Sequence, residues 1–207
     1  HSDVWPHYKN TQVEFLPSGE AKLFKVIEEL KKAEKSIFIE YFILEEGGIV
    51  WKEIYPILVE KASQGVDVRL LYDDWGSSLR LKKLFRKRME KVGIKTAIFN
   101  PLKLRFQVSL QYRDHRKLII IDSTVGFTGG INIADEYANI KKRFGHWHDV
   151  AIMLKGEAVY SMTAIFLENW DFTRKETTDI TLLKPKSYPS DGIVVPYSDS
   201  PFTKNFL

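Results

Sequence analysis

Residues able to attack and bind a phosphate ester lie at fixed distances in the middle of this chain. His115, Lys117 and Asp122 follow the spacing H-x-K-x4-D, and Gly129-Gly130-Ile131-Asn132 comes six residues later. A neutral histidine is a nucleophile near neutral pH, and a lysine attracts a phosphate oxygen. Adjacent glycines let the backbone approach an anion, and an asparagine amide can donate a hydrogen bond to it. The pattern predicts chemistry on a phosphate diester through His115.

The element that must position these groups is a strand predicted over residues 117–121. Alternate side chains of a strand share a face, so His115 and Lys117 should point toward one site. Leu118 and Ile120 should point the other way, into a core. Asp122 is grouped with the catalytic residues by its place in the motif. Its position at a strand end before a turn also favours a structural role, in which it caps backbone donors.

A nucleophilic histidine needs a carboxylate on its far nitrogen, and Asp149 is the predicted partner. It follows His146-Trp147-His148 and precedes a predicted strand over 150–154. An alternative is a zinc cluster, because H-x-H places two imidazoles on one face. No third histidine or cysteine ligand is apparent nearby, so we do not expect a metal.

The pattern of apolar residues predicts the fold class. Helices are expected over 20–33, 49–63, 79–92, 132–137 and 158–170, and further strands over 13–16, 36–44, 66–72, 94–99 and 125–128. Alternating strands and helices are typical of an α/β sheet, and the later run of strands implies an antiparallel part. The prediction is an α/β fold: a mixed β-sheet flanked by helices on both faces.

Composition sets limits on the class of protein. The chain has 207 residues, 44% of them hydrophobic, which suits one domain or one domain with a remnant of another. It has no cysteine, which excludes disulfides and thiolate metal sites. The net charge of +4 favours an anionic partner, either nucleic acid or anionic lipid. No apolar run approaches the roughly 20 residues of a membrane span, so the chain itself is expected to be soluble.

Two further segments bear on organisation and partners. Residues 193–198 repeat the strand-proline-turn pattern of residues 14–19, which predicts the opening of an internal duplication unless the short echo is coincidence. The expected division is a first domain over 1–175, a linker over 176–191 and the beginning of a second domain over 192–207. Cations crowd residues 80–91, either as a solvated face or as a surface for an anionic bilayer.

The H-x-K-x4-D-x6-G-G-x-N spacing resembles the HKD motif of the phospholipase D superfamily. Other segments resemble the first half of bacterial cardiolipin synthases: residues 15–21, 39–43, 70–77, 112–117 and 126–137. The resemblance implies two HKD motifs that face each other, with one histidine attacking phosphorus and the other serving as acid and base. It also implies transfer of a phosphatidyl group between two phosphatidylglycerols, with release of glycerol and no cofactor.

The resemblance assigns roles residue by residue. The implied catalytic residues are His115, Lys117, Asp122, Asn132 and Asp149. The implied substrate-binding residues are Glu40, Tyr112, Gly129 and Gly130.

The chain departs from the family in carrying a single HKD motif. We therefore expect a partner, either a second HKD half or a homodimer partner, and little or no activity from the chain alone. The expected ligands are phosphatidylglycerol and a membrane surface, with the parent protein on the cytoplasmic side of the cell membrane. Nucleic acid is not expected as a partner. The alternatives are a dimeric single-motif phosphodiesterase acting on nucleic acid and a non-catalytic membrane-surface module.

Overall fold

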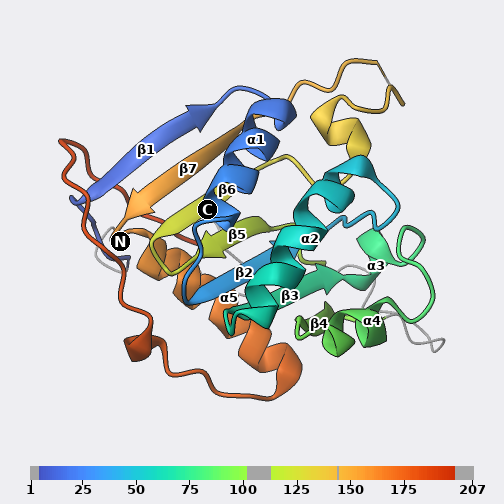
Figure 1. Ribbon diagram of the computed structural model, residues 1–207. Helices are drawn as coiled ribbons and strands as arrows, with labels where there is room; N and C mark the ends of the chain where they lie inside the picture. Colours follow the sequence, from blue (N-terminus) through green and yellow to red (C-terminus); the bar gives the residue numbers. More distant parts are fainter. Residues whose placement is uncertain (1–4, 102–112, 144, 199–207) are drawn as a thin grey trace.

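One mixed sheet of seven strands organises the molecule (Figure 1). The computed structural model describes residues 5–101, 113–143 and 145–198. In the sheet the strands follow the order β1-β7-β6-β5-β2-β3-β4. Their bounds are β1 Thr11–Leu16, β2 Ser36–Tyr41, β3 Asp67–Asp73, β4 Lys95–Phe99, β5 Lys117–Ile121, β6 Val125–Gly129 and β7 Ala151–Gly156.

The sheet has a parallel part and an antiparallel part, as the sequence pattern predicted. Strands β2, β3 and β4 pair in parallel, whereas β5 runs antiparallel to β2, and β6, β7 and β1 continue the antiparallel part. The ends of β2, β3 and β6 therefore meet the beginnings of β5 and β7 at one edge. In Figure 1 the arrowheads of β2 and β3 point toward this edge, where α3 (Asp74–Ser77) also lies. We call it the site edge.

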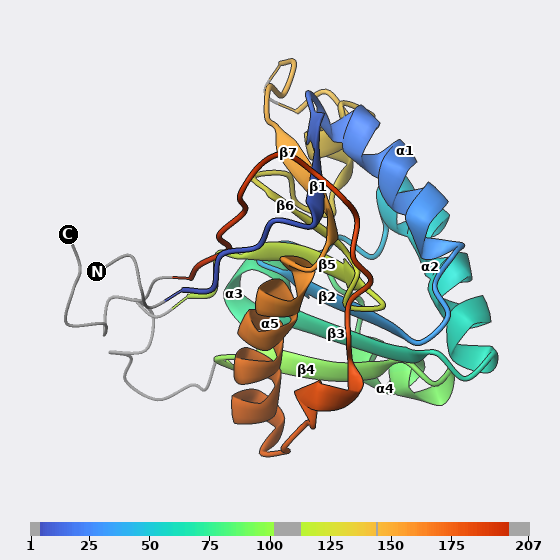
Figure 2. The same ribbon diagram turned by 90° about the vertical axis from the view of Figure 1, so that its left-hand side faces the viewer.

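Helices cover both faces of the sheet (Figure 2). Helices α1 (Gly19–Leu30) and α2 (Ile49–Ser63) lie on one face, and the core beneath them also takes up side chains of α4 (Phe85–Lys91). Helix α5 (Val159–Arg174) covers the other face, with Phe166 stacked on Phe38 of β2 at a centroid distance of 4.9 Å. The predicted fold class, an α/β fold with a mixed sheet flanked on both faces, is confirmed.

Capping explains where the two helices on the first face begin. The hydroxyl of Ser18 accepts a hydrogen bond from the Ala21 amide at 3.2 Å, which starts α1. The Asp135 carboxylate accepts from the Val50 amide at 3.0 Å and holds the start of α2. Asp135 belongs to a short 3-10 helix, η3 (Asp135–Ala138), in place of the helix predicted over 132–137.

The helix predicted over 79–92 is wrong in its first half. Residues 74–77 form α3, a connection made mainly of turns follows over 78–84, and α4 begins only at Phe85. Leu84 has a left-handed backbone (φ 63°), which interrupts a continuous helix. Leu84, which the apolar spacing places on the buried side of that helix, is 57% exposed.

The segment predicted as a linker packs along the domain. The Tyr188 amide donates to the carbonyl of Asn10 at 3.2 Å, and the Lys186 amide donates to the Thr124 hydroxyl at 3.1 Å. A second 3-10 helix, η4 (Ile180–Leu182), lies within this segment. Beyond it, Val194 exchanges two backbone hydrogen bonds with Tyr8.

Candidate active site

His115 and Lys117 meet at the site edge, just before and at the beginning of β5. The Lys117 ammonium lies 3.0 Å from Nδ1 of His115 and also donates to the His115 carbonyl. The Phe42 ring lies against the imidazole at a centroid distance of 4.8 Å. Lys117 is 4% exposed, whereas His115 is exposed. The predicted common face of the two side chains is confirmed, and the imidazole is open to an incoming molecule.

Burial and neighbouring charge shift both groups in a direction that suits phosphate chemistry. Burial lowers the pKa of His115 below its usual 6.5, and the Lys117 ammonium lowers it further. Its imidazole is therefore neutral near neutral pH. Burial lowers the pKa of Lys117 to about 8, which Asp114 and Asp149 oppose. Lys117 thus remains mostly charged near neutral pH but titrates much earlier than an exposed lysine.

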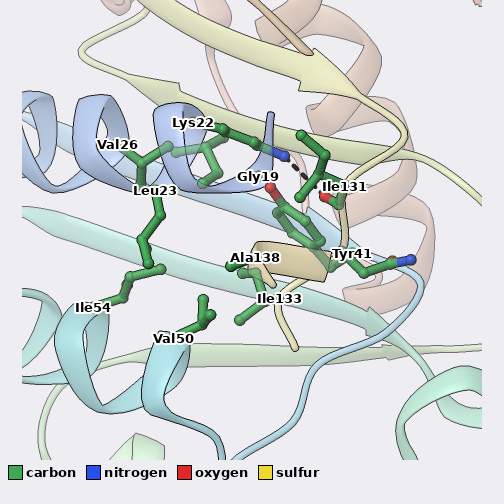
Figure 3. Close-up of a pocket in the computed structure, with 12 residues that line it drawn as sticks. Gly19, Lys22, Leu23, Val26, Tyr41, Val50, Ile54, Ile131, Ile133 and Ala138 are labelled. Atoms are coloured by element: carbon green, nitrogen blue, oxygen red, sulfur yellow. Dashed lines mark hydrogen bonds between the residues drawn. The ribbon is translucent and has the colours of Figure 1, made fainter. Parts of the chain in front are cut away.

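A buried lysine that the motif does not contain lies beside this pair. Lys22 of α1 is 4% exposed, and its ammonium donates to the Ile131 carbonyl at 2.9 Å (Figure 3). The ammonium lies 5.1 Å from the centre of the Tyr41 ring. Burial lowers the pKa of Lys22 to about 7, while Asp149 raises it and Lys117 lowers it. These electrostatic contacts place Lys22 among the charged groups of the site.

The bond from Lys22 fixes the loop that carries Asn132. Asn132 follows Ile131 directly, and its Oδ1 accepts a hydrogen bond from the Ile43 amide at 3.1 Å. Its side chain therefore ties the loop after β6 to the loop after β2. The cavity under α1, lined by Lys22, Tyr41 and Asn132 among others, has a volume of about 20 Å³. It is too small for a phospholipid headgroup, so the candidate substrate surface is the open side of His115.

Gly129 and Gly130 allow a close approach between their loop and the residues at the start of β7, which differs from the predicted approach to a phosphate. A Cβ on Gly130 would lie 2.3 Å from Oδ1 of Asp149, and a Cβ on Gly129 would lie 2.5 Å from the Val150 carbonyl. Gly129 also has φ 150°. The pair thus lets the loop lie against the start of β7 and its carboxylate. The sequence pattern instead predicts an approach to a phosphate.

Asp149 does not hold His115 in this chain. Its Oδ1 accepts from the Val150 amide at 2.8 Å, and its Oδ2 lies 3.4 Å from the indole nitrogen of Trp147. Asp149 influences Lys22 and Lys117 through its charge, which places it at the same edge. The acid that acts on His115 through its charge is Asp114.

The structure corrects the grouping of Asp122 with the catalytic residues. Asp122 follows the far end of β5, and its carboxylate accepts hydrogen bonds from the amides of Glu34, Lys35 and Ser36 at 2.7–2.9 Å. These bonds join the turn before β2 to the end of β5, which is the structural alternative that its position favoured. Asp122 therefore lies at the edge of the sheet opposite His115.

Glu40 also lies away from the predicted substrate surface. It alternates with Tyr41 along β2 and faces α5, where Asn169 donates to its Oε1 at 2.7 Å. Glu40 is 0% exposed, and this burial raises its pKa well above the usual value. The nearby charge of Asp114 raises the pKa further. Arg116 bonds to Asp114 at 2.9 Å and lies 3.6 Å from Glu40. In place of a substrate contact, Glu40 belongs to a buried network that holds residues 114–116.

Asp73 fixes the same segment from β3. Its Oδ2 accepts from the Asp114 amide at 3.3 Å, and its Oδ1 lies 3.7 Å from Arg113. The Arg113 guanidinium lies 5.7 Å from the ring centre of Trp75. The backbone on both sides of His115 is thus held by two buried carboxylates, Asp73 and Glu40, through their neighbours.

Three remaining predictions concern Tyr112, metals and membrane spans. Tyr112 lies outside the described residues. Within residues 5–101, 113–143 and 145–198, no group of three or more His, Asp or Glu side chains is placed to hold a metal ion. Over the same ranges, none of the helices combines the length and the apolar character needed to cross a bilayer.

With this geometry the chain matches a known family. The family described as "Cardiolipin synthase, PLD-like domain" matches residues 26–170, which is more than half of the chain. The chain belongs to this family. The predicted membership in the phospholipase D superfamily, in its cardiolipin synthase branch, is therefore confirmed.

Similar proteins come from bacteria. An uncharacterized protein of Streptococcus mutans is 45% identical over 202 residues, which are 97% of this chain and 44% of that protein. The major cardiolipin synthase ClsA of Bacillus subtilis is 35% identical over 185 residues, which are 89% of this chain and 38% of that protein. The chain thus spans less than half the length of these relatives.

Solved structures support the fold. Phosphatidylserine synthase of Haemophilus influenzae superposes with a TM-score of 0.63 at 17% identity, covering 87% of this chain and 43% of that one. The phospholipase D family member Nuc of Salmonella typhimurium gives a TM-score of 0.55 at 19% identity, covering 80% and 95%. The similarity to both structures shows that this chain has the phospholipase D-like fold.

Proposed function

We propose that this chain supplies one half of the active site of a phosphatidyltransferase that makes cardiolipin and glycerol from two phosphatidylglycerols. The observation that carries the proposal is the pair formed by an exposed, neutral His115 and a buried, mostly charged Lys117, 3.0 Å apart at the site edge. A neutral imidazole can attack phosphorus, and the ammonium can stabilise the charge on a non-bridging oxygen. Family membership supports the lipid substrate.

In the proposed reaction His115 forms a bond to phosphorus, and the bond from phosphorus to the glycerol oxygen breaks. The leaving alkoxide takes a proton from a second histidine, and the intermediate is a phosphohistidine. That second histidine then removes a proton from the hydroxyl of another phosphatidylglycerol. The new oxygen attacks phosphorus and releases His115, so that proton and charge balance over the two steps.

The position of Lys117 supports the need for a second half. An ammonium can only donate, so its contact with Nδ1 leaves the proton of a neutral imidazole on the other nitrogen. For attack through Nε2, an acid must hold a proton on Nδ1, and Asp149 makes no such contact in this chain. We propose that the acid comes from a second HKD half, or from a second copy of the chain. In return, Asp149 would orient the histidine of that partner.

Transfer between lipids is tested with the full-length protein to which these residues belong. Vesicles containing phosphatidylglycerol are incubated with it, and the products are separated and identified by mass spectrometry. Cardiolipin and glycerol in equal amounts are expected, and a His115→Ala variant should form neither. Hydrolysis to phosphatidic acid alone would contradict a transferase.

A second candidate is a phosphodiesterase that works as a symmetric pair of single-motif chains. Two observations favour it. The structural match covers 95% of the Nuc chain, and the net charge of +4 suits an anionic nucleic acid. Incubation with plasmid DNA separates the two candidates. Cleavage that is lost in His115→Ala would establish the second and exclude the first.

A further inference from the structure

The connection between β3 and α4, together with α4, carries apolar side chains that do not pack in the core. Trp75 is 56% exposed, Leu79 is 99% exposed and Leu84 is 57% exposed. Four exposed lysines accompany them: Lys82, Lys83, Lys87 and Lys91. These seven residues are named the 75–91 surface below. Leu84 adopts a left-handed backbone although it is a bulky residue, and this costly conformation leaves its side chain in solvent.

The lysines of this surface keep a net positive charge. The arginines of the same segment are neutralised: Arg80 pairs with Glu136 at 2.8 Å, Arg86 with Glu90 at 2.8 Å, and Arg88 with Glu46. Among the described residues, none of the four lysines forms an ion pair. The positive charge is therefore available to an external anion.

Acidic side chains hold this surface in a fixed position. The Glu46 carboxylate accepts from the Lys82 amide at 2.8 Å as well as from Arg88, and Arg80 bonds to the buried Glu136. The apolar side chains are thus presented from an anchored connection. Phe85 and Met89 point into the core, which fixes the orientation of α4.

The surface also lies next to the nucleophile. Trp75 contacts Arg113, two residues before His115, and Gly76 packs against the carbonyl of Phe42, whose ring contacts the imidazole. A surface that rests on a lipid leaflet here would bring His115 to the level of the phosphates. The apolar side chains would lie among the acyl chains.

We infer that the 75–91 surface docks on an anionic lipid bilayer. The combination of exposed leucines, a tryptophan and unpaired lysines is the chemistry that binds such a surface: apolar tips insert, and cations contact the headgroups. A protein partner is disfavoured, because lysine is depleted in the cores of protein interfaces. The inference rests on the proposed function, since it supplies the lipid substrate to that site.

The test measures binding of the chain to vesicles by co-sedimentation. Vesicles of phosphatidylglycerol mixed with phosphatidylcholine are compared with phosphatidylcholine alone. Each lysine close to an anionic leaflet contributes roughly a five-fold factor in binding. We therefore expect the Lys82→Gln/Lys83→Gln variant, which removes two such lysines, to bind about 25-fold more weakly. The matched control is Lys31→Gln/Lys35→Gln, which removes two exposed lysines from the far edge, before β2, and should bind as the wild type does.

A second pair of variants, one test and one control, measures how much the apolar side chains contribute to vesicle binding. Leu79→Ser/Leu84→Ser should lower binding by about ten-fold or more, because both side chains leave water on insertion. Phe172→Ser removes a side chain that is 80% exposed on α5 and should leave binding unchanged. Equal binding to both vesicle types, equal losses in test and control variants, or no binding by the wild type would overturn the inference. So would a dimer in light scattering that Leu79→Ser/Leu84→Ser abolishes.

His115→Ala separates the docking surface from the chemistry. This variant should bind anionic vesicles as well as the wild type does, although it cannot form a phosphohistidine. If the full-length protein makes cardiolipin but Lys82→Gln/Lys83→Gln leaves vesicle binding intact, the docking surface is refuted and the proposed function stands.

Discussion

Replacing Lys22 by methionine should make the folded chain more stable at neutral pH and less stable in alkali. The folded state lowers the pKa of Lys22 from 10.5 to about 7, mainly through burial. Between these values the unfolded chain binds more protons than the folded chain, so stability rises with pH. Lys22→Met removes this dependence, because methionine has a similar length and no charge.

The magnitude follows from the shift. At about pH 7 the lowered pKa costs the wild type roughly 4 kcal/mol, and at about pH 9.5 roughly 1.5 kcal/mol. The variant loses the bond to the buried Ile131 carbonyl, a loss of about 1–3 kcal/mol at any pH. Lys22→Met should therefore gain about 1–3 kcal/mol at about pH 7, and this advantage should shrink by about 3 kcal/mol at about pH 9.5.

Denaturant unfolding of both proteins at the two pH values measures the difference, and other titrating groups cancel in the comparison. Lys31→Met is the control, since it replaces an exposed lysine just after the same helix by the same residue. A pH-independent difference for Lys22→Met would contradict the lowered pKa, because it would mean that burial of the charged lysine does not destabilise the folded chain. The variant should also lose roughly ten-fold or more in kcat/KM within the full-length protein, because the loop that carries Asn132 loses its bond to Lys22.

Three further predictions concern the site and its frame. Asp122→Ala should destabilise the chain by about 3 kcal/mol in denaturant unfolding, whereas Asp122→Asn keeps one acceptor oxygen and should lose clearly less; equal losses would contradict the capping role. In pH profiles of the full-length protein, kcat/KM should rise below pH 6.5 as His115 loses its proton, and should fall above about pH 8 as Lys117 loses its charge. A plateau of kcat/KM through pH 10 would contradict the role of Lys117. Gly130→Ala should abolish transfer by displacing Asp149, while Gly192→Ala, where a Cβ meets nothing within 4 Å, should not change it; normal activity of Gly130→Ala would count against the packing argument.

The sequence predicted the strand that carries the motif because its signal is local. Apolar residues over 118–121 and the alternation of side chains along the strand were enough to place His115 and Lys117 together. The family resemblance, which rests on spacing, predicted the superfamily for the same reason. The assignment of Asp149 to His115 depends on a contact that a single chain does not make, so it stays a prediction about a pair of halves.

Residues defined by tertiary contacts were missed or misplaced. Lys22 lies in line with Val26 and Leu30 on the buried side of α1, at a spacing of four residues. A lysine in an apolar stripe was the signal that could have revealed it. The first half of the helix predicted over 79–92 failed because its apolar spacing mixed core residues with a residue that remains in solvent, Leu84. Glu40 was misassigned because a strand buried on both faces gives no sequence signal of which face bears the site.

In the proposed reaction we expect His115 to become covalently bonded to phosphorus. This bond is tested most directly with the full-length protein during its reaction with phosphatidylglycerol. The reaction is stopped without acid, and the modified peptide is identified by mass spectrometry. We expect a phosphatidyl group on His115 in the wild type and in Lys31→Gln/Lys35→Gln, and none in His115→Ala. Turnover without any adduct on His115, or an adduct on another residue that persists in His115→Ala, would contradict it.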